Sequence, residues 1–443
     1  MTIRPALVLG CMAALGMPLI PAVRAQDAEG LSLSGQVRAR VEGIGGQFRP
    51  NTVDSDGILL LQTDLSAEYR GQGWRIGGEV IDARGYFERH GSSIGTSEVN
   101  AVEPVQVYIG ADLTDTLSVT AGRFTLALGN GRLVARNNFR NTTNAFTGLR
   151  ADWKRGKARA TGFWTMPQRR LPSDTDGVRD ADVEWDKEGS AQHFFGGDVT
   201  LPLGSRTSVE LYSLRLVEHD APDFATRNRH LVTSGARLFR PPAPGKVDSD
   251  VEAAWQIGTT RASTSAADTE DIGVTAWLVH AEAGYSFASD WHPRIALLFD
   301  YASGDNAGGR YGRFDSLFGS RTKDFGPTSL FGALSRSNLI IPGIRVEAAP
   351  DKRWDMMATA RGLWLASATD GFANTGVRDA SGKSGRDVGG EVDARVRCWL
   401  VPARARLALG AAWLAKGHFL HAAPNAPNTG DTRYGYAEMT VSF

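Results

Sequence analysis

The chain has 443 residues, of which 42% are hydrophobic and 22% are charged. This composition excludes an intrinsically disordered chain. Beyond the first 25 residues, no apolar run reaches the length of a membrane helix. The 49 basic residues balance the 49 acidic ones, so no net positive charge attracts nucleic acid or an anionic membrane surface. Only local clusters of arginine are therefore expected to bind anions.

The first 25 residues are predicted to be a signal peptide. Arg4 precedes an apolar stretch, Ala6 to Ile20, which is too short and too interrupted by Pro18 to span a bilayer. Small or permissive residues precede the bond after Ala25, where we expect cleavage. The mature protein would then be residues 26–443, a single barrel domain with long loops.

One of the two cysteines, Cys11, lies in the predicted signal peptide. The stretch Val8-Leu9-Gly10-Cys11 also matches a lipoprotein signal, but it would leave almost no apolar region before the cysteine. Cleavage after Ala25 removes Cys11 and leaves Cys398 alone. The exported chain is therefore expected to form no internal disulfide.

The rest of the chain consists of short segments of alternating polarity, separated by Gly, Pro, Asp and Asn. Between residues 59 and 70, for example, Leu61 and Leu65 alternate with polar side chains such as Asp64. Alternation with a period of two residues is typical of antiparallel strands whose two faces meet different surroundings. The candidate strands, in chain order, are 31–42, 58–70, 73–83, 104–112, 116–124, 143–153, 157–165, 193–201, 206–216, 230–238, 250–258, 274–287, 292–303, 339–349, 353–366, 387–400, 403–415 and 432–443.

Two features favour a membrane barrel over a soluble sandwich. One strand face carries charged residues throughout, as a water-filled lumen allows, and the other carries small and aliphatic residues with aromatics near the segment ends. These aromatics are Trp74, Trp153, Trp164, Trp277, Tyr301, Trp364 and Trp413. The last segment ends in Phe443, which resembles the assembly signal of bacterial outer-membrane proteins. We therefore predict an all-β protein, a transmembrane antiparallel β-barrel of about 18 strands in the bacterial outer membrane.

Long gaps separate some of the predicted strands. They are expected to be extracellular loops or constrictions of the channel. The gaps are 84–103, 125–142, 166–192, 304–338 and 367–386.

Several short motifs follow one another along residues 104–443. They are Gly122-Arg123, Leu128-Gly129, Arg132-Leu133-Val134, Phe139-Arg140-Asn141-Thr142, Ala145-Phe146, Ala302-Ser303-Gly304-Asp305, Phe314-Asp315-Ser316-Leu317-Phe318, Ser337-Asn338-Leu339, Trp364-Leu365-Ala366-Ser367, Val388-Gly389-Gly390-Glu391-Val392-Asp393 and Lys416-Gly417-His418-Phe419. Together they resemble the alginate export family of outer-membrane barrels. The resemblance implies an 18-stranded barrel with an arginine-lined lumen and long loops, which passes an anionic polysaccharide without covalent chemistry. The chain departs from the family pattern at Gly319-Ser320-Arg321 and at Pro327, so alginate itself is not assumed as the cargo.

The arginine pattern supports an anion path. In an extended conformation, Arg132, Arg136 and Arg140 project to one side, and their repulsion disfavours such a row unless water, acids or an anionic ligand compensates it. The planar guanidinium fork matches a carboxylate, and a series of weak sites suits conduction of a polyuronate. The alternative interpretation is a solvated loop whose arginines pair with Asp152 or with nearby acids.

Other charged residues are predicted on the lumen face. Within one segment, Glu391, Asp393, Arg395 and Arg397 share a face, which indicates either a mixed-charge lumen wall or a salt-bridge ladder that stiffens the barrel. The complete set of pore-lining candidates is Arg123, Arg132, Arg136, Arg140, Arg150, Asp152, Arg361, Glu391, Asp393, Arg395 and Arg397.

No catalytic residue, resident metal or cofactor is predicted. The eight histidines are scattered without a zinc-binding context. One acidic stretch offers the oxygen ligands that calcium prefers, but it lacks EF-hand spacing, and a solvated loop is the preferred interpretation. Its residues are Asp174, Asp176, Asp180, Asp182, Glu184 and Asp186.

The sequence thus predicts a channel, and not an enzyme, that passes an anionic polysaccharide or oligosaccharide through an arginine-lined lumen. One alternative is an uptake or general anion-selective porin for small acids, and another is a structural or adhesive barrel that does not conduct. The expected partners are the transported anions and the outer-membrane lipids. A secretion route would also require periplasmic secretion proteins, and no nucleic-acid partner is expected.

Overall fold

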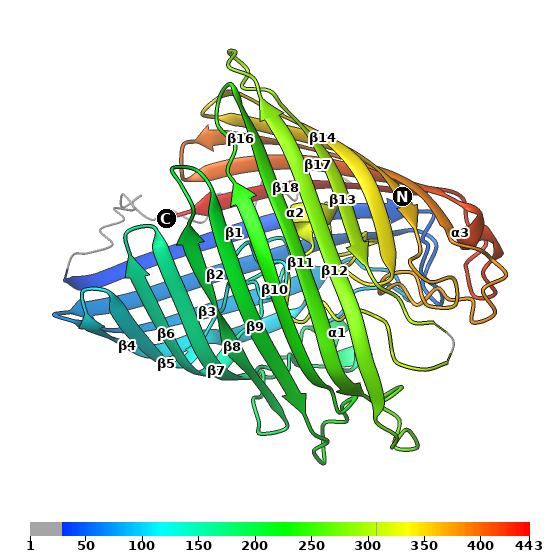
Figure 1. The fold of residues 1–443 in the computed structure, drawn as a ribbon, viewed down its shortest axis with the longest axis horizontal. Coiled ribbons are helices and arrows are strands. Elements are labelled where there is room, and N and C mark those ends of the chain that lie inside the picture. Colours follow the sequence, from blue (N-terminus) through cyan, green and yellow to red (C-terminus); the bar gives the residue numbers. More distant parts are fainter. Residues whose placement is uncertain (1–28, 307) are drawn as a thin grey trace.

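The computed structural model describes residues 29–306 and 308–443, and it contains one closed antiparallel barrel (Figure 1). Each strand pairs with its neighbours in sequence, and the pairing of β1 with β18 closes the sheet. The strands are β1 Gly30–Gly45, β2 Asp56–Gly71, β3 Trp74–Tyr86, β4 Asn100–Thr114, β5 Leu117–Phe124, β6 Phe146–Arg155, β7 Ala158–Pro167, β8 Gln192–Pro202, β9 Ser208–Glu218, β10 His230–Arg240, β11 Lys246–Thr260, β12 Ile272–Ser286, β13 Arg294–Ala302, β14 Leu339–Asp351, β15 Trp354–Trp364, β16 Asp387–Val401, β17 Ala405–Lys416 and β18 Thr432–Ser442. Short helices α1 Thr175–Asp180, α2 Thr322–Phe325 and α3 His418–Ala422 lie in loops.

The predicted 18-stranded barrel is confirmed. Each predicted strand overlaps one observed strand, and their ends differ by at most four residues. No helix among the described residues is long and apolar enough to cross a bilayer. The predicted leader, its cleavage after Ala25 and Cys11 lie outside the described residues.

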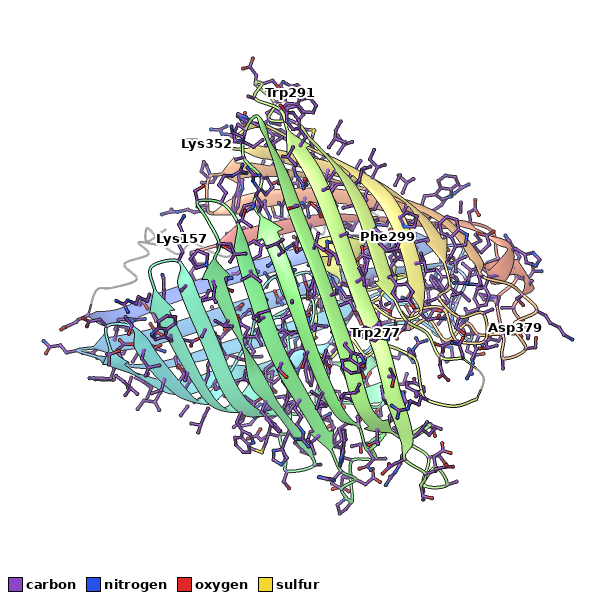
Figure 2. All side chains as sticks on the ribbon, in the orientation of Figure 1. Lys157, Trp277, Trp291, Phe299, Lys352 and Asp379 are labelled. Carbon is purple, nitrogen blue, oxygen red and sulfur yellow. The ribbon has the colours of Figure 1, made fainter. Side chains whose placement is uncertain are left out.

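Side chains alternate between the lipid-facing and the lumen-facing side of the wall. On β2, Leu61 and Leu65 are exposed on the outer side, whereas Leu60 and Gln62 are buried on the inner side. Figure 2 shows Trp277 on the outer surface of the barrel wall. Since every strand is paired along both edges, the backbone polar groups are satisfied within the sheet, as a bilayer requires.

Aromatic side chains gather near both ends of the strands. Trp74 and Trp354 begin strands that follow short turns, whereas Trp277, Trp364 and Trp413 lie near the long loops, and all five are exposed on the outer side. Two such rows are the aromatic girdles of an outer-membrane barrel, in which short turns face the periplasm and long loops face the exterior. The long loops therefore mark the extracellular end.

Two of the long loops fold into the barrel. Residues 125–145 between β5 and β6 form the first inner segment, and residues 303–338 between β13 and β14 form the second inner segment. A parallel bridge between Val134 and Phe318 joins them, and the N–H of Ala135 donates to the C=O of Phe318 at 3.1 Å. These two predicted gaps are therefore constrictions of the lumen.

Hydrophobic clusters hold the inner segments against the wall. Phe314 of the second inner segment packs in one cluster with Phe146 of β6 and Phe194 of β8. Phe331 of the same segment belongs to another cluster, with Leu414 of β17 and other lumen-facing residues of β1, β2 and β14–β18. Burying one phenylalanine contributes about 1.5–3 kcal/mol, so the packing fixes where the inner segments cross the lumen.

We expect Phe314→Ala to loosen the second inner segment. Phe314 is 1% exposed, and truncating a buried phenylalanine costs about 3–5 kcal/mol in a packed core. Thermal unfolding of the refolded protein in detergent should move to lower temperature, and single-channel current should fluctuate more. Leu297→Ala is the control, since Leu297 is 65% exposed toward lipid. Equal effects of the two substitutions would contradict this role of Phe314.

Candidate functional site

The carboxylate of Asp324 joins the two inner segments. It accepts from Arg132 Nε of the first inner segment at 2.9 Å and from Arg336 of the second. The backbone C=O of Asp324 accepts from Arg361 of β15 at 2.8 Å, and Arg132 also pairs with Glu252 of β11 at 2.7 Å. All of these side chains are buried. Although burial opposes ionisation, Arg132 and Arg336 hold the pKa of Asp324 well below its usual range.

The far end of the first inner segment is tied to strands β1–β3. Arg136 pairs with Asp64 of β2 at 3.0 Å and donates to Glu79 of β3 at 2.8 Å. Arg38 of β1 donates to the backbone C=O of Arg140 at 2.7 Å. The first inner segment therefore crosses the lumen from β11 to β1–β3 and forms a constriction.

The arginines of the first inner segment do not form the predicted one-sided row. Asn137 has a left-handed backbone (φ 65°), which interrupts the extended conformation between Arg136 and Arg140. Arg132 and Arg136 instead turn to buried acids on different parts of the wall, because an unpaired buried charge is costly. Asp152 is not one of these partners, since it pairs with Arg150 at 2.7 Å.

Arg140 lines a cavity of about 550 Å³ at the extracellular side of the constriction, which we name the vestibule cavity. Six loops contribute to its wall, among them both inner segments. Its charged lining residues are Arg49, Glu98, Arg140, Arg169, Arg170 and Arg321. Five guanidiniums therefore share the cavity with one carboxylate.

Ion pairing distinguishes the constriction from the vestibule cavity. Within the described residues, none of the five lining arginines, Arg49, Arg140, Arg169, Arg170 and Arg321, forms an ion pair within 4 Å, whereas Arg132 and Arg136 of the constriction do. A Cβ on Gly332 would meet Arg49 Nη2 at 3.2 Å and Arg321 Nη2 at 3.7 Å, so these two atoms are at most about 7 Å apart. The cavity thus concentrates cations without ion pairs, which are compensated only by the nearby Glu98 and by carbonyl groups such as that of Leu330, which accepts from Arg49 at 2.8 Å.

Burial and the proximity of other cations lower the pKa of two of these guanidiniums. Burial, together with the charges of Arg140 and Arg49, lowers the pKa of Arg321 to about 9. Burial and Arg140 likewise lower the pKa of Arg170 to about 10. A lowered pKa means that the charged form is held at a cost, which a bound anion reduces. Because the guanidinium fork binds carboxylates in bidentate fashion, the cavity is suited to a carboxylate ligand.

The predicted residues of β15 and β16 form two ion-paired groups. Arg361 pairs with Glu391 at 3.3 Å and with Asp393, and all three side chains are buried. Arg397 pairs with Asp355 at 2.8 Å, and these two side chains are 31% and 34% exposed. The first group stiffens the wall at the constriction, and the second lies in the more open periplasmic half.

The other predicted residues are also paired. Arg395 lies 3.5 Å from the same acid as Arg397. Arg150 and Asp152 pair with each other on β6, each about 30% exposed. Arg123 pairs with Glu103 of β4 at 2.6 Å, and it also holds the loop that follows β7 by pairing with Glu188 at 2.8 Å. Arg140 is therefore the one predicted arginine that lies in the vestibule cavity.

Sequence reasoning missed Arg49, Arg170 and Arg321. They belong to three loops that are far apart in the chain, and no periodicity connects them. The one available signal was composition, because only 8 of the 49 basic residues are lysines. Arg321 also lies in the stretch Gly319-Ser320-Arg321, which departs from the family pattern.

The predicted acidic stretch contributes to loop structure. Asp174 accepts from the N–H of Gly177 at 2.8 Å and caps α1. Asp186 is buried and accepts from the N–H of Leu171 at 3.0 Å. In residues 29–306 and 308–443, no group of three His, Cys, Asp or Glu side chains is arranged to hold a metal ion.

Comparison with known proteins identifies related sequences and folds. The family model for alginate export matches residues 30–432. No curated protein matches the chain. Among solved structures, Pseudomonas aeruginosa OpdO has a TM-score of 0.59 at 13% identity, covering 94% of this chain and 97% of that one. OpdL of the same organism gives 0.57 at 10% identity, covering 93% and 98%. P. aeruginosa OpdK, solved with vanillate, gives 0.56 at 12% identity, covering 93% and 98%. At these identities the solved structures establish the fold alone.

We expect Asp324→Asn to destabilise the constriction. The substitution removes the charge that compensates two buried arginines, and breaking a buried pair costs about 3–5 kcal/mol. Thermal unfolding should occur at lower temperature, and single-channel recordings should contain additional open levels. Asp355→Asn is the matched control, because its arginine partners are about one-third exposed and such pairs contribute about 0–1 kcal/mol. If Asp324→Asn has the same melting curve and the same single-channel current as the wild type, Asp324 does not join the two inner segments.

Proposed function

Because the chain belongs to the alginate export family, we propose that this outer-membrane channel passes an anionic polysaccharide or oligosaccharide through its vestibule cavity. Membership of an export family supports an outer-membrane channel, and the barrel shares its fold with OpdO. An arginine-lined path conducts such a cargo by binding and release, without covalent chemistry.

The observation that carries the proposal is the absence of ion pairs for the five vestibule arginines within the described residues. Two guanidiniums about 7 Å apart repel each other by about 2 kcal/mol at an effective dielectric constant of 20. In the neighbouring constriction, Arg132 and Arg136 pair with acidic side chains, so such side chains are tolerated in this lumen. The unpaired arginines therefore indicate that an anion from outside the chain completes the cavity.

The ion-paired arginines have a different part in the proposed passage. At the constriction, Arg132 is buried with its acids and is held as structure. In the periplasmic half, Arg397 and Asp355 are partly exposed, and water there screens their attraction. A passing carboxylate can exchange with such weakly held acids, and weak repeated sites allow a polymer to move on.

A porin for small carboxylic acids is the second candidate. The fold of OpdK, which was solved with the carboxylate vanillate, favours it, and a cavity of about 550 Å³ also accommodates a small acid. Channel block separates the two candidates, because oligouronates should block a polymer path for longer than uronate monomers at equal carboxylate concentration. Equal block by monomers and oligomers would favour the small-acid porin.

We expect the vestibule arginines to set ion selectivity. The triple variant Arg140→Ala, Arg170→Ala, Arg321→Ala should lower the anion-to-cation permeability ratio at least several-fold, since it removes three charges without ion pairs. The measurement is the reversal potential of single channels in a salt gradient. The control is Lys157→Ala with Lys352→Ala, which removes two exposed cations at short turns (Figure 2). Unchanged selectivity in the triple variant would refute the role of the cavity.

Selectivity should also depend on pH through Glu98. Burial raises the pKa of Glu98, so this carboxyl takes up a proton at a higher pH than usual. As the pH falls through that raised value, the cavity loses its one negative charge, and the preference for anions should increase. Reversal potentials measured from pH 8 to pH 4 test this. Glu98→Gln should show the high anion selectivity at every pH in that range. If the selectivity of this variant changes with pH as much as that of the wild type, Glu98 is not the titrating group.

A further inference from the structure

A second cavity, of about 270 Å³, adjoins the vestibule cavity. It lies against β10–β12, and we name it the side cavity. Ser316, Leu317 and Asn374 line both cavities, so these residues form the divider between them. Only this one layer of side chains therefore separates the two cavities, and a molecule that occupies both must displace part of it.

The side cavity holds an arginine beside an aromatic ring. The guanidinium carbon of Arg227 lies 5.0 Å from the centre of the Tyr311 ring, and Nη1 donates to the Tyr311 hydroxyl at 3.3 Å. Arg227 Nη2 is buried and has no hydrogen-bond partner in the described part of the chain. A buried donor without a partner is costly. Since Arg227 lines the side cavity, a shift of its guanidinium would bring this donor to a ligand oxygen there.

The other arginines of the side cavity are compensated. Arg229 pairs with Asp315 at 2.7 Å, and Arg313 pairs with Asp370 at 2.8 Å. Within the described residues, the side cavity therefore offers one cation without an ion pair, Arg227, together with an aromatic ring and neutral hydrogen-bonding groups such as Gln256. An aromatic ring with polar neighbours suits a sugar ring, with its apolar faces and hydroxyl edges. The vestibule cavity, in contrast, offers charge.

We propose that the two cavities are adjoining subsites for a single anionic oligosaccharide. The carboxylates of the chain lie among the vestibule arginines, and the next sugar extends past the divider into the side cavity, where Arg227 and Tyr311 bind it. This inference rests on the proposed function and narrows its substrate to uronate chains of at least two residues. Two linked contacts bind better than either alone, because the second contact is intramolecular.

Asn374 gives a precise test of the divider. Its Oδ1 accepts from Arg313 Nη2 at 3.3 Å, which an aspartate of the same shape can also do. Asn374→Asp therefore adds a negative charge between the two cavities while it keeps this contact. The matched control is Asn428→Asp, the same change at an exposed loop residue that lines neither cavity.

The experiment measures single-channel block of the refolded full-length protein by galacturonate and its oligomers of two to six residues. The dissociation constant should fall by about tenfold or more between the monomer and the shortest oligomer that reaches both subsites. Arg227→Gln and Asn374→Asp should each reduce that gain several-fold, and Asn428→Asp should leave it at the wild-type value.

Two results would overturn the inference and leave the proposed function standing. In the first, monomer and oligomers block with the same affinity at equal carboxylate concentration. In the second, Arg227→Gln and Asn374→Asp change the dissociation constants of the monomer and of the oligomers by the same factor. In both cases uronates still block an anion-selective channel. If no uronate blocks and the channel lacks anion selectivity, the proposed function fails, and the two-subsite inference fails with it.

Discussion

The architecture of the lumen depends on a buried carboxylate, that of Asp324. Two long segments enter the barrel, and each brings an arginine, Arg132 or Arg336, to this one acid. Neither cation would be stable in the interior alone, so the three side chains fix the segments relative to each other and to β11 and β15. The hydrophobic clusters then hold this crossing against the wall, and the vestibule cavity is the space that remains on its extracellular side.

Charge compensation divides the lumen into regions with different chemistry. At the constriction, Arg132, Arg136 and Arg361 each have an acid at hydrogen-bonding distance, whereas the five arginines that line the vestibule cavity form no ion pair within the described residues. Composition alone does not produce this contrast, because acidic and basic residues are equal in number. The distribution of acids along the path, and not the count of arginines, distinguishes groups that build the channel from groups that are available to a ligand.

The fold was predictable from the sequence because lipid and water impose opposite demands on alternate residues. Leu61 and Asp64, for example, had to face different sides of any sheet that spans a bilayer. The site was less predictable, since loop conformation is not periodic. Arg132 was expected to face a ligand and is a buried structural group, and Arg321 was missed because its neighbours come from other loops. Of the arginines that line the vestibule cavity, Arg140 alone lies in one of the family motifs.

The central claim is that an anion completes the vestibule cavity, and locating bound anions tests it most directly. Crystals of the refolded protein soaked in bromide would reveal anion positions by anomalous scattering, with a caesium soak as the cation counterpart. The account predicts bromide among Arg140, Arg170 and Arg321, and no caesium there. Bromide confined to the periplasmic half, beside pairs such as Arg397 and Asp355, would contradict the account.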